Sequence, residues 1–336
     1  MDMKLTGQTV LVTGGAGFIG SHLVELLIER GFSVVVLDSL RNGSRANLAT
    51  VADSPQMRFI QGDILDLDTC QRVCRNVGTV FHLACLGVRH SLHSPVENHQ
   101  VNAFGTLNVL QAARTANVQR FVYVSTSEVY GRATDFPIRE TTATWPLTLY
   151  GASKLAGEHY TRAYFESFRL PTVCVRPFNN FGSRSHFEGD TGEVIPRFVL
   201  RALSGLPPVI FGDGSHTRDF LYVRDCAEGL LQIAECDALL GQVVNLGYGE
   251  ETRIDTLAEV VLRAVGRKDL KPIHEKGRPA DIARLWVDTS KLKAAVPFQP
   301  KVPLMEGVAL AIEHFRKLLD ENPRCLEQMT ARNWEV

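Results

Sequence analysis

The octapeptide Thr13-Gly14-Gly15-Ala16-Gly17-Phe18-Ile19-Gly20 stands between an apolar run, Thr9–Thr13, and an amphipathic pattern over Ser21–Arg30 that stops at Gly31. Its glycines at positions 14, 17 and 20 permit a tight turn, the close approach of a phosphate, and close packing of a helix on a sheet. The start of the following helix presents unpaired N–H groups to an anion. A strand, a glycine-rich turn and a helix in this order predict a dinucleotide-binding unit.

The next strand strengthens this prediction. Ser33–Asp38 is an apolar run that ends in a carboxylate. Asp38 is placed to accept hydrogen bonds from ribose hydroxyls and to repel a 2′-phosphate, which favours NAD over NADP as the cofactor. Arg41 and Arg45 are nearby cations that would weaken this preference. An aspartate at a strand end is also a common turn former, and this simpler interpretation stays open.

Apolar strands and helical patterns alternate through the first half of the chain. The strands are apolar on nearly every residue, which is typical of a parallel sheet covered on both faces. We therefore expect an α/β fold with a Rossmann-type doubly wound parallel sheet, in a domain over residues 1–177. The further expected strands are Met57–Ile60, Thr79–Ala84, Arg120–Ser125 and Thr172–Arg176, and the expected helices lie near Asp66–Asn76, Val96–Asn117 and Tyr150–Arg169.

The pattern changes after Pro177. Residues 178–192 are rich in Asn, Ser, Gly and His, and we expect a functional loop there. The polar stretch Ser183–Glu193 is expected to border the sugar, with His186 in solvent. Short strands are expected at Val209–Phe211 and Gln242–Leu246. We expect a smaller, helix-rich substrate lobe over residues 178–336, with the chain crossing back to the first domain in places. The helices expected there lie near Glu193–Ser204, Arg224–Glu235, Asp255–Val265 and Leu304–Leu319.

Composition excludes several classes of protein. The 336 residues are 45% hydrophobic and carry a net charge of -1, which argues against disorder and against nucleic acid or an anionic membrane as a partner. No apolar run reaches the length of a membrane span, and no signal peptide opens the chain, so a cytoplasmic location is expected. Seven scattered cysteines do not indicate disulfides, and no metal site is expected.

A second group of residues is suited to proton transfer. Tyr150 and Lys154 are four residues apart at the start of an expected helix, so they share a face, and the cation lowers the pKa of the phenol. The segment Ser125–Gly131, with Glu128 inside it, closes the fifth strand at the edge where doubly wound sheets bind ligands. Glu128 as an ordinary surface residue remains an alternative. Other strand ends at this edge are Asp63 and Ile64, and His82–Cys85.

These motifs together resemble a known family. TGGAGFIG, HLA, STSEVYG, YGASK, RPFN and GDGSHTRDFLYVRD occur in the order found in extended short-chain dehydrogenases/reductases of the NAD-dependent nucleotide-sugar epimerase/dehydratase family. The resemblance covers residues from about 8 to 319. It implies that hydride moves from the sugar C4 to tightly held NAD⁺ and later returns, so that NAD is recycled.

The resemblance also implies roles for individual residues. Tyr150 is the base for the C4 hydroxyl, Thr126 binds the same oxygen, and Lys154 holds the nicotinamide ribose. Ser127 and Glu128 complete the expected catalytic set. The expected cofactor contacts are Gly14, Gly17, Phe18, Ile19, Gly20, Asp38, Asp63, Ile64, Leu83, Ala84, Tyr150 and Lys154.

The implied substrate is a nucleotide-diphosphate sugar. Arg218 and Arg278 resemble the arginines that clamp the diphosphate in this family, a role that suits their forked donors. Asn102 resembles an asparagine that supports the site, and Phe211 is expected beside the base. The expected substrate contacts are Arg89, Asn102, Asn179, Val194, Phe211, Arg218 and Arg278.

The motifs favour different reactions. Thr126-Ser127-Glu128 resembles elimination enzymes, in which the glutamate takes the C5 proton, and this favours a nucleotide-hexose 4,6-dehydratase. Gly87–Ser91 resembles a segment of C4 epimerases, so epimerisation is the main alternative, with decarboxylation of a UDP-glucuronate-type substrate behind it. An ordinary alcohol dehydrogenase and a non-catalytic NAD-binding sensor are further possibilities. The resemblance also implies a homodimer formed through helices within Val96–Asn117 and Tyr150–Arg169.

Overall fold

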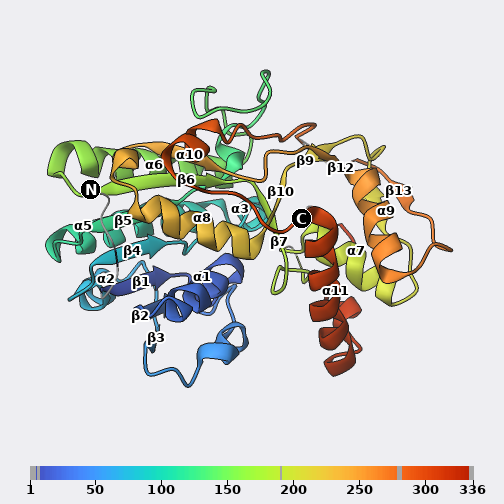
Figure 1. Ribbon diagram of the computed structural model, residues 1–336, viewed down its shortest axis with the longest axis horizontal. Coiled ribbons are helices and arrows are strands. Elements are labelled where there is room, and N and C mark those ends of the chain that lie inside the picture. The colour runs from blue at the N-terminus through green and yellow to red at the C-terminus, as the bar shows by residue number, and fades with distance from the viewer. Residues whose placement is uncertain (1–4, 6–7, 190, 278–281, 333–336) are drawn as a thin grey trace.

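The computed structural model describes residues 5, 8–189, 191–277 and 282–332 and is built around one parallel sheet (Figure 1). Seven strands pair in the order β11-β6-β5-β4-β1-β2-β3, and every pairing is parallel. This confirms the α/β doubly wound prediction. The strands are β1 (Thr9–Thr13), β2 (Ser33–Asp38), β3 (Met57–Gln61), β4 (Thr79–His82), β5 (Arg120–Val124), β6 (Thr172–Pro177) and β11 (Val243–Leu246).

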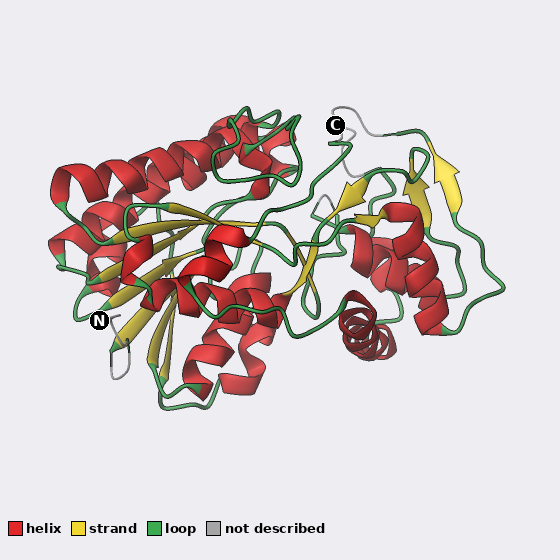
Figure 2. Cartoon of the chain, turned by 45° about the horizontal axis from the view of Figure 1, so that its top comes forward, coloured by secondary structure: helices red, strands yellow, loops and turns green. Residues whose placement is uncertain are grey.

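Alternate residues of the strands pack on opposite faces of the sheet, as a period of two requires. Val10 and Val12 of β1 face the helices α1 (Phe18–Glu29) and α8 (Val223–Glu235), whereas Leu11 between them faces the other layer. Figure 2 shows the strands fanned between these layers of helices. The second layer consists of α2 (Leu67–Cys74), α5 (Thr106–Thr115) and α6 (Leu149–Phe168).

A second core lies beside the sheet, at the right of Figure 1. Phe198, Leu257 and Phe315 pack together there, and each belongs to a different helix. These helices are α7 (Val194–Leu203), α9 (Ile254–Val265) and α11 (Leu304–Glu321). Short strand pairs accompany them: β8 (Val209–Phe211) with β13 (Ile273–Glu275), β9 (Thr217–Arg218) with β12 (Thr252–Arg253), and β7 (Asn179–Phe181) with β10 (Phe220–Tyr222).

The remaining helical segments are short. They lie in connections between strands or near the end of the described chain. They are α3 (His90–His93), α4 (Pro95–His99), α10 (Ser290–Ala295), the π-helical turn η2 (Gln100–Gly105), and the 3₁₀ turns η1 (Arg45–Val51), η3 (Ser127–Val129), η4 (Asp237–Leu239) and η5 (Cys325–Gln328). Within the described ranges, no helix is both long enough and apolar enough to cross a membrane.

Two segments differ from the expectations. The strand expected at Gln242–Leu246 in the smaller lobe is β11, which pairs with β6 and extends the main sheet. Asn179–Phe181, expected to lie in a loop, forms β7 because its backbone pairs with β10 in parallel. The chain thus returns to the main sheet after residue 177, and a division into domains at that residue remains a prediction.

A buried ion pair joins α6 to β6. Nε and Nη2 of Arg176 donate to the two carboxylate oxygens of Glu158 at 2.9 and 2.7 Å. The side chains are 6% and 2% exposed, so neither charge has water as an alternative partner. The geometry is bidentate, which is the strongest arrangement for an arginine and a carboxylate.

Replacing Glu158 with alanine should therefore lower the free energy of unfolding by about 3–5 kcal/mol, because Arg176 is left buried without its partner. Urea denaturation followed by circular dichroism measures this change. The matched control is Glu166→Ala on the exposed side of the same helix, which should stay within about 0.5 kcal/mol of the wild type. Equal effects of the two substitutions would contradict the importance of the pair.

Candidate active site

A cavity of about 800 Å³ opens at the carboxyl ends of β1, β2, β4 and β5 and reaches the first residues of α7. The strand order reverses between β1 and β4, and ligands bind at such a reversal in doubly wound sheets. Its lining contains residues from the glycine-rich turn, the strand ends, α6 and the second core. One cavity thus joins the expected cofactor half and the expected substrate half.

The glycine-rich turn leaves room that any side chain would fill. Gly14 has φ +70°, and a Cβ atom there would stand 2.7 Å from the nitrogen of Ala84. A Cβ atom on Gly20 would stand 2.1 Å from the oxygen of Gly14. Helix α1 then begins with no side-chain cap and no acidic residue in its first turn, so its N–H groups remain available to an anion. This cradle fits the pyrophosphate of NAD.

Asp38 ends β2 at the side of this turn. Its carboxylate accepts hydrogen bonds from the backbone N–H groups of Ala16 at 2.9 Å and Leu40 at 2.8 Å, while burial raises its pKa. The two arginines expected to weaken a preference for NAD are engaged with protein groups. Arg41 pairs with Glu97, and Arg45 lies 4.4 Å from the centroid of the Phe59 ring.

Tyr150 lies in the first turn of α6, which is capped by a hydrogen bond from the N–H of Gly151 to the Thr148 hydroxyl at 3.0 Å. The phenol lies beside the side chains of Thr126 and Cys85, which both act on its pKa. Burial raises the pKa of the phenol well above its usual value, and the Cys85 and Glu128 side chains add to the shift. A neighbouring positive charge is therefore needed before the phenol can act as a base near neutral pH.

Lys154 supplies one such charge from the next turn of α6. Its side chain is only 2% exposed, and Nζ donates to the backbone oxygen of Val124 at 2.7 Å. The ammonium also lies 4.6 Å from the centroid of the Tyr123 ring. Burial lowers its pKa. The four-residue spacing places Lys154 and Tyr150 on the same side of the helix, and both line the cavity.

The segment after β5 brings three polar side chains to the same place. Thr126, Ser127 and Glu128 all line the cavity, and the Thr126 hydroxyl accepts a hydrogen bond from the N–H of Glu128 at 3.2 Å. Two more lining atoms, Ser125 Oγ and Asn179 Oδ1, are buried without a hydrogen-bond partner among the described residues. Buried polar atoms of this kind indicate a site that a polar ligand completes.

Most, but not all, of the expected substrate contacts lie in the cavity lining. Arg89, Asn179, Val194, Phe211 and Arg218 line the cavity, and Arg278 lies outside the described residues. Nη1 of Arg218 donates to two backbone oxygens at 2.8 Å, which holds its guanidinium at the wall.

The structure does not place Asn102 among the lining residues. The Asn102 side chain accepts a hydrogen bond from the Leu86 N–H at 2.8 Å and donates to the Ser153 hydroxyl at 3.0 Å. Its amide groups are therefore committed to protein partners, and the side chain ties the segment after β4 to α6. The expected contact of Asn102 with substrate is replaced by this positioning contact.

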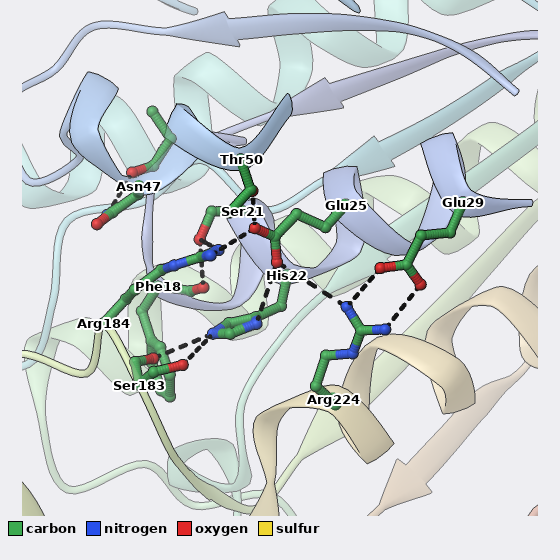
Figure 3. A network of polar contacts seen from close by, with 11 residues as sticks. Phe18, Ser21, His22, Glu25, Glu29, Asn47, Thr50, Ser183, Arg184 and Arg224 are labelled. Atoms are coloured by element: carbon green, nitrogen blue, oxygen red, sulfur yellow. Dashed lines mark hydrogen bonds and ion pairs between the residues drawn. The ribbon is translucent and has the colours of Figure 1, made fainter. Parts of the chain in front are cut away.

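A polar network fixes the cofactor helix to the segment that follows β7 (Figure 3). Arg184 donates to Ser21 at 3.2 Å and to Glu25 at 2.5 Å, and His22 contacts the backbone oxygen of Ser183 at 3.1 Å. Burial lowers the pKa of His22 to about 4, so the imidazole is neutral near pH 7. The cofactor turn and the wall that carries Asn179 are thus held in one arrangement.

Two residues to which the sequence analysis assigned no individual role also line the cavity. Cys85 contacts the catalytic candidate Tyr150, and Glu193 precedes α7. Cys85 follows β4 at the carboxyl edge of the sheet, and a residue at this edge is expected to lie near a bound ligand. His186, expected in solvent, also lines the cavity, and burial lowers its pKa.

Among the described residues, no cluster of three or more His, Cys, Asp or Glu side chains is arranged to hold a metal ion.

Cys85 is the half-buried member of the seven cysteines, and the other six are buried. We therefore expect one thiol to react rapidly with 5,5′-dithiobis(2-nitrobenzoate) in the folded protein, followed by six that react only on unfolding. NAD should slow the rapid reaction because it covers the same cavity wall. Absorbance of the released thiolate measures both phases. Cys85→Ser should remove the rapid phase, and its persistence would contradict the assignment.

Comparison with known proteins is consistent with this geometry. The chain is 36% identical over 309 residues to a UDP-glucose 4-epimerase from Mycolicibacterium smegmatis, covering 91% of this chain and 98% of the relative. The solved UDP-glucose 4-epimerase of Thermus thermophilus, in complex with NAD, superposes with a TM-score of 0.83 at 36% identity, covering 92% of this chain and 99% of that one.

A relative with a different activity is equally similar in structure. The dTDP-glucose 4,6-dehydratase DesIV from Streptomyces venezuelae, solved with NAD bound, has a TM-score of 0.88 at 31% identity and covers 94% of this chain and 99% of its own. The model of the NAD dependent epimerase/dehydratase family matches residues 10–247, more than half of the chain. The chain therefore belongs to the NAD-dependent epimerase/dehydratase family, and its cofactor is NAD.

Proposed function

We propose that this protein is a nucleotide-hexose 4,6-dehydratase, which removes water from the sugar through a transient 4-keto intermediate. The observation that carries the proposal is the carboxylate of Glu128, which lines the same cavity as Tyr150 and acts on the pKa of its phenol. Removal of the C5 proton from a 4-keto sugar needs such a base, whereas inversion at C4 alone does not. The likeness to DesIV supports this choice.

The first step belongs to Tyr150 and its neighbours. NAD⁺, when bound, supplies a hydride acceptor for C4 of the sugar. Tyr150 takes the proton of the C4 hydroxyl, and the Thr126 hydroxyl, which lies beside the phenol on the cavity wall, orients the same oxygen. Lys154 is assigned to lower the pKa of Tyr150, because an ammonium on the same face of the helix favours the phenolate form.

The second step belongs to the segment after β5. The C4 carbonyl acidifies the proton on C5, and Glu128 removes it. The electron pair left on C5 forms a double bond to C6, and the C6 hydroxyl leaves with a proton as water. The hydride taken from C4 then returns to C6 while Glu128 returns a proton to C5, so that the nicotinamide ends oxidised and the sugar has lost only water. Ser127 is next to Glu128 on the cavity wall and is assigned to donate to that leaving oxygen. Asn179, with an unpartnered buried oxygen, and Arg218 bind the diphosphate in this proposal.

Epimerisation at C4 is the second candidate. Gly87–Ser91 resembles the corresponding segment of epimerases, and the M. smegmatis and T. thermophilus relatives are named as such enzymes. An epimerase requires room for the keto sugar to turn over, and a glutamate beside the tyrosine reduces that room. The two reactions differ in mass: dehydration removes water, epimerisation leaves the mass unchanged, and decarboxylation of a uronate removes carbon dioxide.

Incubation with UDP-, GDP-, dTDP- and CDP-hexoses in heavy water, read by mass spectrometry, tests the proposal. One substrate should lose water and gain deuterium. Glu128→Gln should reduce that turnover by about 10²-fold or more, because the amide cannot take the C5 proton, while nucleotide-sugar binding is retained.

Tyr150→Phe serves as the matched control, since it should abolish conversion at the earlier C4 step. Full activity of Glu128→Gln on the true substrate would overturn the dehydratase assignment. A product of unchanged mass would establish the epimerase alternative. A steady rise in reduced-nicotinamide absorbance would instead indicate an ordinary dehydrogenase.

We also propose that the protein is a homodimer. Val96 on α4 is 70% exposed, Phe104 in η2 is 52% exposed, and Leu149 at the start of α6 is 54% exposed. Segments α4, η2 and α6 pack against one another, so these apolar side chains belong to one helical layer. A paired copy would remove this apolar area from water.

Sedimentation at micromolar concentration should therefore give twice the mass of the chain. Phe104→Glu should shift the equilibrium toward the monomer, because it buries a charge at the contact. Leu206→Glu, an exposed position elsewhere at 42% exposure, is the control and should leave the mass unchanged. A wild-type protein that sediments as a monomer would refute the dimer.

A further inference from the structure

Glu193 is the residue before α7, and its side chain lines the cavity. The Glu193 carboxylate makes no hydrogen bond with the first turn of α7. The backbone of Glu193 is held instead, since its N–H donates to the oxygen of His186 at 2.8 Å. The carboxylate is thus directed to the cavity and does not serve the helix.

Burial of this carboxylate has a cost that the surrounding residues do not offset by hydrogen bonds. Burial raises the pKa of Glu193 to about 8, and the positive charge of Arg89 partly opposes the shift. Among the described residues, none donates a hydrogen bond to the carboxylate. A partly buried carboxylate that accepts no hydrogen bond from its own helix or from another protein group is a candidate functional residue.

The charged groups near Glu193 come from several elements. Arg89 follows β4 and lines the cavity. His186 belongs to the loop before α7, and because burial lowers its pKa it adds no positive charge near pH 7. Arg197 lies one turn further along α7, where Nη2 donates to the backbone oxygens of Thr330 and Ala331 at 2.9 and 3.0 Å. Arg89 is therefore the cation whose field acts on Glu193 within the cavity.

We propose that Glu193 is a specificity-determining residue that selects a nucleotide sugar with an uncharged hexose over one with a hexuronate. This inference rests on the proposed nucleotide-sugar function and names the sugar class. The carboxylate accepts a hydrogen bond from a hydroxyl or amide N–H of the sugar. A C6 carboxylate has no proton to donate, and its charge repels that of Glu193.

Arg89 alone would favour the opposite choice. An arginine on a cavity wall attracts a sugar carboxylate, and its forked donors match that group. The negative charge of Glu193 offsets this attraction, since the two charges already act on one another. The pair therefore leaves the sugar end of the cavity close to neutral when Glu193 is ionised, and an added uronate carboxylate finds no excess positive charge.

UDP-glucose and UDP-glucuronate form a matched pair of probes, because they differ only at C6. Their dissociation constants are measured by calorimetry on the full-length chain with NAD, in a Tyr150→Phe background so that neither sugar is converted. We expect the background protein to bind the hexose more tightly than the hexuronate. At pH 9, where Glu193 is ionised, adding Glu193→Gln should reduce that preference by about tenfold, because the amide keeps the size of the side chain and removes its charge.

Glu188→Gln is the matched control. Glu188 lies in the same loop, outside the cavity lining, and its carboxylate accepts a hydrogen bond from the N–H of Phe187 at 3.1 Å. This substitution should leave the preference unchanged. Equal preferences in the Glu193→Gln and Glu188→Gln proteins, or tighter binding of the hexuronate by the background protein, would overturn the inference and leave the proposed function standing. Failure of both sugars and of free UDP, GDP, dTDP and CDP to bind would overturn both.

The pH dependence gives an independent readout. Glu193 is uncharged below its raised pKa and ionised above it. The C6 carboxylate of the hexuronate is ionised throughout, so the repulsion grows as pH rises through about 8. The preference for the hexose should increase between pH 7 and pH 9 in the background protein and stay level in Glu193→Gln. A preference that falls over this range would overturn the inference.

Discussion

The close passage of β1 beside β4 is the constraint on which the rest of the cavity depends. Val10–Thr13 pair in parallel with Thr79–His82, so the chain leaves both strands at the same edge. Beyond that edge the backbone of Gly14 passes so near Ala84 that a Cβ atom would stand 2.7 Å from its nitrogen. A side chain at this glycine position would push the turn away from the strand end. The cavity floor, the helix terminus and the cofactor orientation all follow from this approach.

The parts of the fold that were predictable from sequence depend on local physics. The glycine turn requires a positive φ and an absent Cβ, and the strands over residues 33–38 and 120–124 bury almost every side chain. Long-range pairing carries no such signal. Val243–Leu246 has the same apolar pattern whether it joins β6 or a separate lobe, and Asn179–Phe181 is a strand only because β10 lies beside it.

The same distinction applies to the cavity. Motif residues such as Tyr150 and Lys154 were predictable because four residues of helix bring them to one face. Cys85 at its strand end and Glu193 in the loop beside the sugar were predictable in position but not in role. Their roles depend on the residue that lies near each: the phenol of Tyr150 in one case and Arg89 in the other. Asn102 shows the reverse case. The motif placed it near the substrate, and folding turned its amide to Leu86 and Ser153.

The electrostatics of the cavity set the order of the proposed chemistry. Burial, Cys85 and Glu128 all raise the pKa of Tyr150. Glu128, the proposed base for C5, therefore disfavours the phenolate of Tyr150, the proposed base for the C4 hydroxyl. In the proposed mechanism Lys154 opposes this shift, although burial lowers the pKa of its own ammonium. A bound NAD⁺ would add a second positive charge that favours the phenolate, and hydride transfer from C4 would remove that charge. Proton removal at O4 must come first, and Glu128 then meets a neutral phenol while it takes the C5 proton.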